Sequence, residues 1–277
     1  MLSGQDYIRV RNTRHGLMMY AVNDVYIGRS LDRYGESSEI ELAALRRMIQ
    51  PGQVVLDIGS NIGTHTLAFA EAVGPTGMVV AVEPQRRIFQ MMCGNVALNA
   101  VPNVTAYWAA AGAHRGWLHV PVVDYGKAGN YGGLALGEWS QGDRVPVLTI
   151  DELGLPACHL IKIDVQGMER DVLTGAVHTI ERYRPILYVE NDRRENSPAL
   201  LQQVFDLGYR AYWHRPALFN PNNYLLNPEN IFGNLCAINV LCLPAAVRAD
   251  VGLPEVVSTD AWVGGLWRGF MPRRPGP

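Results

Sequence analysis

The chain has 277 residues, 48% of them hydrophobic, and a formal net charge of −2. A chain of this length could hold one large α/β domain or two small ones, and one is favoured because the motifs and the later strands run without a break in composition. The hydrophobic content is ordinary for a globular protein with a large core. The nearly balanced charge argues against the basic surface that nucleic acids and anionic membranes require. No apolar run approaches the roughly 18 residues of a membrane-spanning helix.

The N-terminus and the cysteines both favour a cytoplasmic protein. The opening sequence, MLSGQDYIRVRN, lacks the apolar core of a secretory signal peptide. The four cysteines have neither the spacing of metal ligands nor the density of a disulfide framework. Reduced thiols are therefore expected.

The first fifty residues predict short strands followed by a helix. Residues 1–29 alternate between apolar and polar side chains, which indicates two or three strands with a hairpin turn at His15-Gly16. Ser37 or Ser38 is suited to begin a helix with apolar positions between Ile40 and Met48, and Pro51-Gly52 ends it.

The stretch Gln53 to Thr66, QVVLDIGSNIGTHT, predicts a strand, a tight turn and a helix. Val54 to Leu56 is a β-branched, apolar run typical of a buried parallel strand, and Asp57 ends it. Glycines in the turn let backbone N–H groups approach a ligand, so a side chain at Gly59 would enter that ligand's path. This order is the first crossover of a doubly wound, Rossmann-like α/β sheet.

The next apolar run, Met78 to Val82, ends at Glu83, which follows Gly59 by 24 residues. An acidic residue at about this spacing accepts hydrogen bonds from ribose hydroxyls. The turn G-x-N-x-G departs from the dinucleotide pattern G-x-G-x-x-G, and the Asp57 carboxylate would repel a pyrophosphate. It would instead attract an ammonium group. A ligand with a ribose at one end and an ammonium at the other is S-adenosylmethionine.

The alternation of strands and helices continues to the end of the core. The predicted elements are a helix at 85–99, strands at 104–109, 160–164, 185–190, 209–213 and 235–243, and helices from Met168 and from Ser197. Residues 113–147 interrupt it with a loop rich in Gly, Tyr and Asn, which is either functional or a β-excursion.

Several segments resemble the FkbM family of class I S-adenosylmethionine-dependent methyltransferases. They are SLDRYGESSEIEL, VLDIGSNIGTHTLAFA, AVEP, AGNYGGLAL, LTIDEL, LIKIDVQGMERDVLTGA and RPILYVEN. The similarity covers residues 29–243 and implies a mostly parallel methyltransferase sheet with helices on both faces and one antiparallel strand near the C-terminus. It also implies O-methylation of a hydroxyl on a sugar, polyketide or other natural product. The implied domains are an N-terminal segment over the cofactor site (1–50), the core (51–243) with its inserted loop, and a tail (244–277).

The resemblance, together with the strand ends, predicts the residues around the cofactor. They are Tyr34, Gly35, Glu36, Asp57, Gly59, Asn61, Gly63, Thr64, Thr66, Glu83, Pro84, Ala109, Ala110, Asp164 and Gln166. Two alternatives stay open: Glu36 as an acid favoured at a helix start, and the alanines as ordinary packing between strand and helix.

The reaction centre is predicted at the ends of the later strands. Asp164 is expected to orient the acceptor hydroxyl and take its proton, with His214 as an alternative base. Lys162 shares a sheet face with Asp164, and either Lys162 or the sulfonium of the cofactor can supply a cation near Asp164 and Glu190. Asp164 as a helix cap and His214 as an ordinary histidine remain alternatives, as does a divalent metal held by Asp164, Glu190 and His214. No metal is favoured.

The acceptor is predicted to meet a flap and the end of the fourth core strand. Its contacts are expected from Asn130, Tyr131, Gln166, Glu169 and His214. The expected partner is a small-molecule hydroxyl acceptor, with neither nucleic acid nor membrane, and a homodimer is left open. Two rival functions remain: a catalytically silent cofactor-binding protein on the same fold, and an NAD-dependent oxidoreductase.

Overall fold

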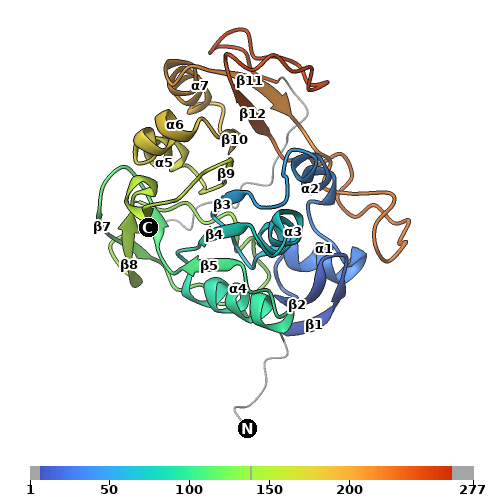
Figure 1. Ribbon diagram of the computed structural model, residues 1–277. Coiled ribbons are helices and arrows are strands. Elements are labelled where there is room, and N and C mark those ends of the chain that lie inside the picture. Colours follow the sequence, from blue (N-terminus) through green and yellow to red (C-terminus); the bar gives the residue numbers. More distant parts are fainter. Residues whose placement is uncertain (1–6, 138, 264–277) are drawn as a thin grey trace.

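The computed structural model describes residues 7–137 and 139–263. Its centre is a seven-stranded sheet in the order β11-β12-β10-β9-β3-β4-β5 (Figure 1). The strands are β3 (Val54–Ile58), β4 (Met78–Val82), β5 (Val104–Tyr107), β9 (Leu160–Ile163), β10 (Ile186–Glu190), β11 (Tyr209–His214) and β12 (Asn239–Pro244).

All neighbouring pairs in this sheet are parallel except the two that involve β12. The chain order moves outward from β3 to β5 and then restarts at β9 on the other side of β3. This reversal creates a switch point between β3 and β9, where ligands of open α/β sheets bind. The predicted doubly wound fold and its antiparallel strand near the C-terminus are confirmed.

Helices cover both faces of the sheet, and alternate residues of each strand pack on opposite helices. One face packs on α5 (Glu169–Thr174), α6 (Val177–Tyr183) and α7 (Ser197–Asp206). The other packs on α2 (Glu39–Arg46) and α3 (Thr64–Val73). The two groups of helices flank the sheet in Figure 1. The helix α4 (Arg86–Leu98) lies beside an N-terminal hairpin.

The N-terminal hairpin consists of β1 (Ile8–Thr13) and β2 (Gly16–Ala21), which confirms the predicted hairpin. Its turn is Arg14-His15, one residue earlier than predicted. It is followed by α1 (Ile27–Tyr34), which the alternating pattern did not predict as a helix. Asn95 of α4 donates to the main chain of Met19 and accepts from it, which holds α4 against β2.

The inserted segment forms a three-stranded sheet of β6 (Ala110–Ala111), β7 (Gly116–Val120) and β8 (Asp143–Leu148). A short 3₁₀ helix, η1 (Ile150–Leu153), follows it. The predicted strand 104–109 therefore ends early, at Tyr107, and the chain turns into the second sheet. The last core strand begins at Asn239, later than predicted.

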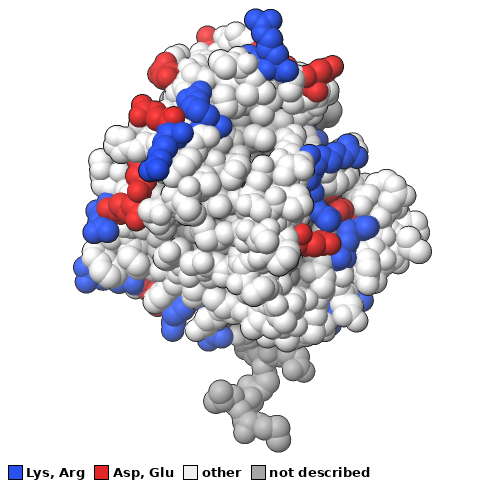
Figure 2. Space-filling model, viewed as in Figure 1, with Lys and Arg blue, Asp and Glu red and all other residues white. Residues whose placement is uncertain are grey.

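Part of the predicted tail lies against the edge of the main sheet. Trp213 N–H donates to the carbonyl of Pro254 at 2.8 Å, and Val256 N–H donates to Ala211 at 2.8 Å. Residues 264–277, which hold the rest of that tail, lie outside the described residues. Within the described part, no helix combines the length and the apolarity that crossing a membrane needs. On the face shown in Figure 2, basic and acidic side chains surround a broad uncharged centre.

Candidate functional site: a cavity at the strand ends

A cavity of about 440 Å³, including its open mouth, lies at the carboxyl ends of β3, β4 and β9. Its walls are Ile58, Gly59, Val82, Glu83, Pro84, Gln85, Ala110, Ala111, Gly132, Leu134, Leu136, Asp164, Val165, Gln166 and Met168. Six of these were predicted as cofactor contacts: Gly59, Glu83, Pro84, Ala110, Asp164 and Gln166.

The turn after β3 is fixed by the strand beside it. Gly59 has a φ of +78°, and a Cβ there would lie 1.8 Å from the carbonyl oxygen of Asp164. The expectation that a larger residue would only block the ligand is therefore wrong. A side chain at Gly59 collides with the backbone and would disturb the turn itself.

Glu83 ends β4 inside the cavity and is almost fully buried. Its Oε2 accepts from the N–H of Asn61 at 3.0 Å, and its Oε1 accepts from the N–H of Gln85 at 2.8 Å. Burial, only partly offset by these hydrogen bonds, raises the pKa of Glu83 to about 7. Each carboxylate oxygen has a second lone pair, so the group still accepts from a ligand hydroxyl.

Gln85 supplies an acceptor that the sequence analysis missed. Its Nε2 donates to the carbonyl of Tyr131 at 2.7 Å. Its Oε1 is buried and has no partner among the described residues. A ligand that carries N–H or O–H donors satisfies this atom. The strand ends therefore fit a nucleoside better than an apolar ligand. The signal available in the sequence was the position of Gln85, two residues beyond Glu83.

Asp57 does not reach the cavity, although it was predicted to attract the ammonium group of the cofactor. It is fully buried, and its Oδ2 accepts from Thr66 Oγ1 at 2.6 Å. Its Oδ1 lies 3.3 Å from Lys162 Nζ. Because Asp57 lies within β3, its side chain points under α3 rather than beyond the strand end. Thr66 is likewise an interior partner of Asp57.

Lys162 is a buried cation between two carboxylates. Its Nζ donates to the Gly59 carbonyl at 2.8 Å and lies 3.7 Å from Asp164 Oδ2. Burial lowers the pKa of Lys162, but the charges of Asp57 and Asp164 outweigh that effect and raise it overall. The predicted sharing of one face by Lys162 and Asp164 is confirmed.

Asp164 is the partly exposed carboxylate of the site, with 39% of its side chain accessible. Gln166 Nε2 donates to Asp164 Oδ1 at 3.0 Å and to Glu190 Oε2 at 2.9 Å. Burial and the neighbouring charge of Asp164 raise the pKa of Glu190 well above its usual range.

Glu169 serves the backbone at the start of α5. Its Oε1 accepts from the N–H of Gly167 at 2.9 Å and from Val165 at 3.3 Å. Glu169 thus stabilises the turn after β9 and does not line the cavity, and its contact with the acceptor stays a prediction.

The loop that covers the cavity differs from the predicted flap. The ring of Tyr131 is buried against Tyr125, and its hydroxyl donates to backbone carbonyls of the same loop. Asn130 Oδ1 accepts from the N–H of Gly133. Both side chains stabilise the loop in this structure, and their contact with the acceptor stays a prediction. Leu134 and Leu136 form the cover instead.

The remaining predicted cofactor residues lie behind the residues that line the cavity. Asn61 touches the covering loop, since a Cβ on Gly132 would lie 2.7 Å from its Nδ2. Gly63 and Thr64 begin α3, and Ala109 packs into the apolar core. None of these lines the cavity.

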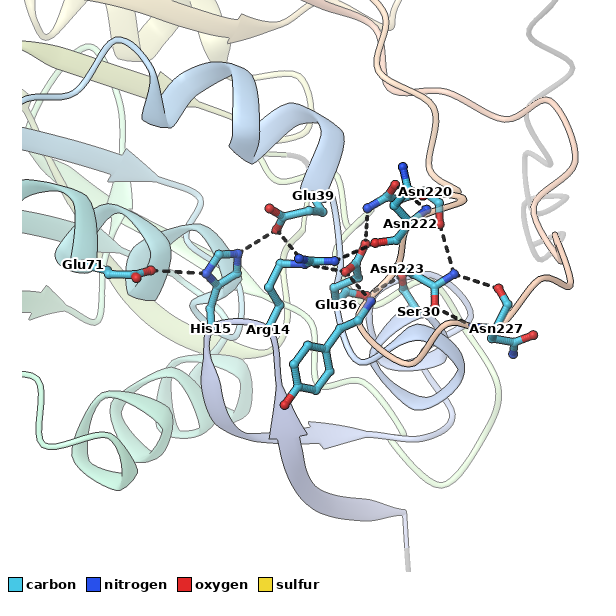
Figure 3. A network of polar contacts seen from close by, with 11 residues as sticks. Arg14, His15, Ser30, Glu36, Glu39, Glu71, Asn220, Asn222, Asn223 and Asn227 are labelled. Atoms are coloured by element: carbon cyan, nitrogen blue, oxygen red, sulfur yellow. Dashed lines mark hydrogen bonds and ion pairs between the residues drawn. The ribbon is translucent and has the colours of Figure 1, made fainter.

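Glu36 lies in a different contact, between the N-terminal hairpin and the connection 216–234 (Figure 3). Tyr34 and Gly35 contact the same connection. The Glu36 carboxylate accepts from Arg14 Nε at 2.6 Å, from Asn220 Nδ2 at 2.8 Å and from the N–H of Tyr224 at 2.8 Å. Tyr34 is buried, and its hydroxyl donates to the carbonyl of Glu229. The three residues fasten the connection to the hairpin and do not line the cavity.

His214 ends β11, three strands away from the strand of Asp164. Strand spacing alone separates their backbones by roughly 14 Å. Burial lowers the pKa of His214, and its Nδ1 lies 2.7 Å from the hydroxyl of Tyr188. Within the described ranges, no group of three His, Cys, Asp or Glu side chains is arranged to hold a metal ion.

Known proteins resemble the chain at several levels. A segment of 68 residues is 38% identical to the 23S rRNA (uracil(1939)-C(5))-methyltransferase RlmD of Acinetobacter baylyi, covering 24% of this chain and 15% of that protein. The chain thus matches only a small part of that relative's length.

Solved structures also match the chain, at low sequence identity. A methyltransferase FkbM from Methylobacillus flagellatus has a TM-score of 0.46 and 17% identity, over 70% of this chain and 48% of that one. An S-adenosylmethionine-dependent O-methyltransferase from Thermotoga maritima has a TM-score of 0.48 and 13% identity, over 87% and 79%.

The family model described as the methyltransferase FkbM domain matches residues 57–211. This segment contains the three strand ends that line the cavity, the covering loop, and the carboxylates that follow β9 and end β10. It is more than half of the chain, so the protein belongs to the family of the methyltransferase FkbM domain.

Proposed function

We propose that the protein is an S-adenosylmethionine-dependent methyltransferase that methylates a hydroxyl on a small molecule such as a sugar or polyketide. One observation carries the proposal: a single cavity joins the buried acceptors Glu83 and Gln85 at the end of β4 to the partly exposed Asp164 at the end of β9. Glu83 and Gln85 suit the nucleoside of the cofactor, and the end of β9 at Asp164 suits the groups that react.

The residues divide the work of binding. Glu83 would accept from the ribose hydroxyls, Gln85 Oε1 would accept from a further donor of the nucleoside, and Ala110 and Leu134 would enclose the flat base. S-adenosylmethionine, when bound, supplies an activated methyl group on a positively charged sulfur.

Asp164 performs the proton transfer in this proposal. The acceptor oxygen forms its new bond to carbon while the carbon–sulfur bond breaks, and the electron pair of that bond stays on sulfur. The hydroxyl proton passes to Asp164, whose neighbour Glu190 has a pKa raised well above its usual range. Lys162 Nζ, 3.7 Å from Asp164 Oδ2, orients that carboxylate.

Calorimetry of the full chain with S-adenosylhomocysteine and, separately, with NAD tests the cofactor. Micromolar binding of S-adenosylhomocysteine, worth roughly 8 kcal/mol, is expected. Binding of NAD without S-adenosylhomocysteine binding would overturn the proposal in favour of an oxidoreductase.

Mass spectrometry of a panel of hydroxylated sugars and polyketides, incubated with the protein and S-adenosylmethionine, tests the reaction. The expected result is the gain of one CH₂ unit that survives treatment with base, as an ether does. Cofactor binding without any methylated product over the panel and over a metabolite extract would favour a catalytically silent binding protein. Methylation of carbon or nitrogen would contradict the hydroxyl acceptor.

A further inference from the structure

A chain of buried side chains connects α2 to the end of β11, on the face of the sheet that holds Lys162. Glu41 Oε2 lies 3.4 Å from Asn239 Nδ2, which in turn lies 2.9 Å from the hydroxyl of Tyr188. The Tyr188 hydroxyl lies 2.7 Å from His214 Nδ1. Glu41, Asn239 and Tyr188 are all buried.

The direction of these hydrogen bonds follows from their first member. A carboxylate only accepts, so Glu41 orients the amide of Asn239 with its NH₂ group toward Oε2. Glu41 is fixed in turn by His65, whose Nε2 lies 2.9 Å from its other oxygen. The NH₂ group has two protons: one goes to Glu41 and the other to the oxygen of Tyr188.

Tyr188 must then donate to His214. Its oxygen already accepts from Asn239, and the buried hydroxyl proton has one described acceptor, His214 Nδ1. A ring nitrogen that accepts is unprotonated, so a neutral His214 carries its proton on Nε2. No described residue is hydrogen-bonded to Nε2.

We propose that Glu41, Asn239 and Tyr188 are positioning residues that hold His214 in its Nε2–H tautomer, so that His214 offers a hydrogen-bond donor, and not a general base, to an oxygen of the methyl acceptor. The acceptor role rests on the proposed methyltransferase function. The substrate class is an extended molecule, with a carbonyl, ether or hydroxyl oxygen several bonds away from the methylated group. This follows because His214 lies three strands away from the strand of Asp164.

The tautomer is testable without knowledge of the acceptor. Long-range ¹H–¹⁵N spectra of the full chain, labelled at histidine nitrogens, distinguish the two neutral forms, and His214→Gln assigns the signal. The groups that face the ring or the hydrogen-bond chain are Glu41, His65, Lys162, Asp164, Tyr188, Glu190 and Asn239, so a pH titration has to follow His65 as well.

Wild-type His214 should show the Nε2–H form at pH 8. Tyr188→Phe removes a bond made only to the neutral ring, so the His214 pKa should rise and the tautomer preference should weaken. Tyr212→Phe is the matched control: its ring is buried on the same face, and no hydrogen bond joins it to His214. An Nδ1–H form in the wild type, or equal effects of both variants, would overturn the proposal. Neither outcome would affect the cofactor test above.

With an acceptor from the panel, the two roles of His214 separate kinetically. His214→Leu should raise KM for the acceptor about 5- to 10-fold, the equivalent of roughly 1 kcal/mol for one neutral hydrogen bond. His214→Gln, which keeps an N–H donor, should recover part of that loss. A fall of kcat by about 10²-fold or more in both variants would mean that His214 is the base, and would overturn the assignment.

Discussion

The two faces of the central sheet are built from the same strands but contain different chemistry. Along β9, Ile161 and Ile163 face α5–α7 and are fully buried among apolar neighbours. Leu160 and Lys162 face α2 and α3, and this row continues to Asp164 beyond the strand. The first face is apolar along its whole length. The second changes from apolar to charged as it approaches the cavity.

This difference indicates what each face contributes. Apolar side chains contribute stability wherever they pack, so the α5–α7 face tolerates small changes of shape. Buried ions cost desolvation unless they are paired, so the buried Asp57 and Lys162 depend on one another. The α2–α3 face therefore combines a structural and a chemical role.

The largest effect is expected for Asp164→Asn on the charged row. The variant cannot take the acceptor proton, so kcat should fall by about 10²–10⁴-fold in the methylation assay. Affinity for S-adenosylhomocysteine, measured by calorimetry, should change little. Full kcat would show that Asp164 only caps the turn after β9 and would remove the chemical role of this row.

Lys162→Met should lower the free energy of unfolding by about 3–5 kcal/mol, because it leaves Asp57 buried without its cation. Urea denaturation measures this loss. The double variant Asp57→Asn with Lys162→Met removes both charges and should recover part of it. A loss below about 1 kcal/mol would show that the pair is not needed on this face.

Glu83→Ala acts at the strand ends, where the two faces meet. Affinity for S-adenosylhomocysteine should weaken by about 1.5–3 kcal/mol through loss of hydrogen bonds to the carboxylate. Calorimetry at pH 8 is the measurement. Glu169→Gln is a control, since that carboxylate bonds the backbone of the turn after β9. Unchanged affinity in the Glu83 variant would place the ribose elsewhere.

The raised pKa of Glu83 predicts a dependence of stability on pH. The folded pKa is about 7, above the ordinary 4.5, so the folded state binds this proton more tightly than the unfolded state. The contribution of Glu83 to stability is therefore fully present below about pH 4.5 and is lost as pH rises to about 7. From pH 5 to pH 8 the free energy of unfolding, measured with urea, should fall in both proteins. The fall should be about 1–3 kcal/mol smaller in Glu83→Gln than in the wild type. Parallel pH profiles would contradict the raised value.

The smallest effect is expected on the apolar face. Ile163 follows Lys162 in sequence, but its side chain lies on the opposite face of the sheet. Ile163→Val removes one methylene there and should lower the free energy of unfolding by about 0.5–1.5 kcal/mol. Turnover and S-adenosylhomocysteine affinity should stay unchanged. A fall in kcat would show that the two faces are coupled.

The sequence alone determined the path of the backbone through the core. The apolar runs at 54–56 and 78–82, the glycines after the first and the spacing to Glu83 predicted a strand, turn and helix at a ligand site, since period and turn chemistry are local properties. The same motifs identified the family that the match over residues 57–211 confirms. The helix α1 was missed because its segment is short and its alternating start favoured strands.

Only the tertiary structure decided where each polar side chain points. Asp57 looked like a cofactor contact from its place at a strand end, yet Thr66 and Lys162 hold it under α3. Tyr131 looked like a lid, yet its ring completes a cluster with Tyr125. The partners of such groups come from segments far apart in the chain, as Glu41, Tyr188 and Asn239 do around His214. Their meeting depends on the order of the strands, which no local pattern contains.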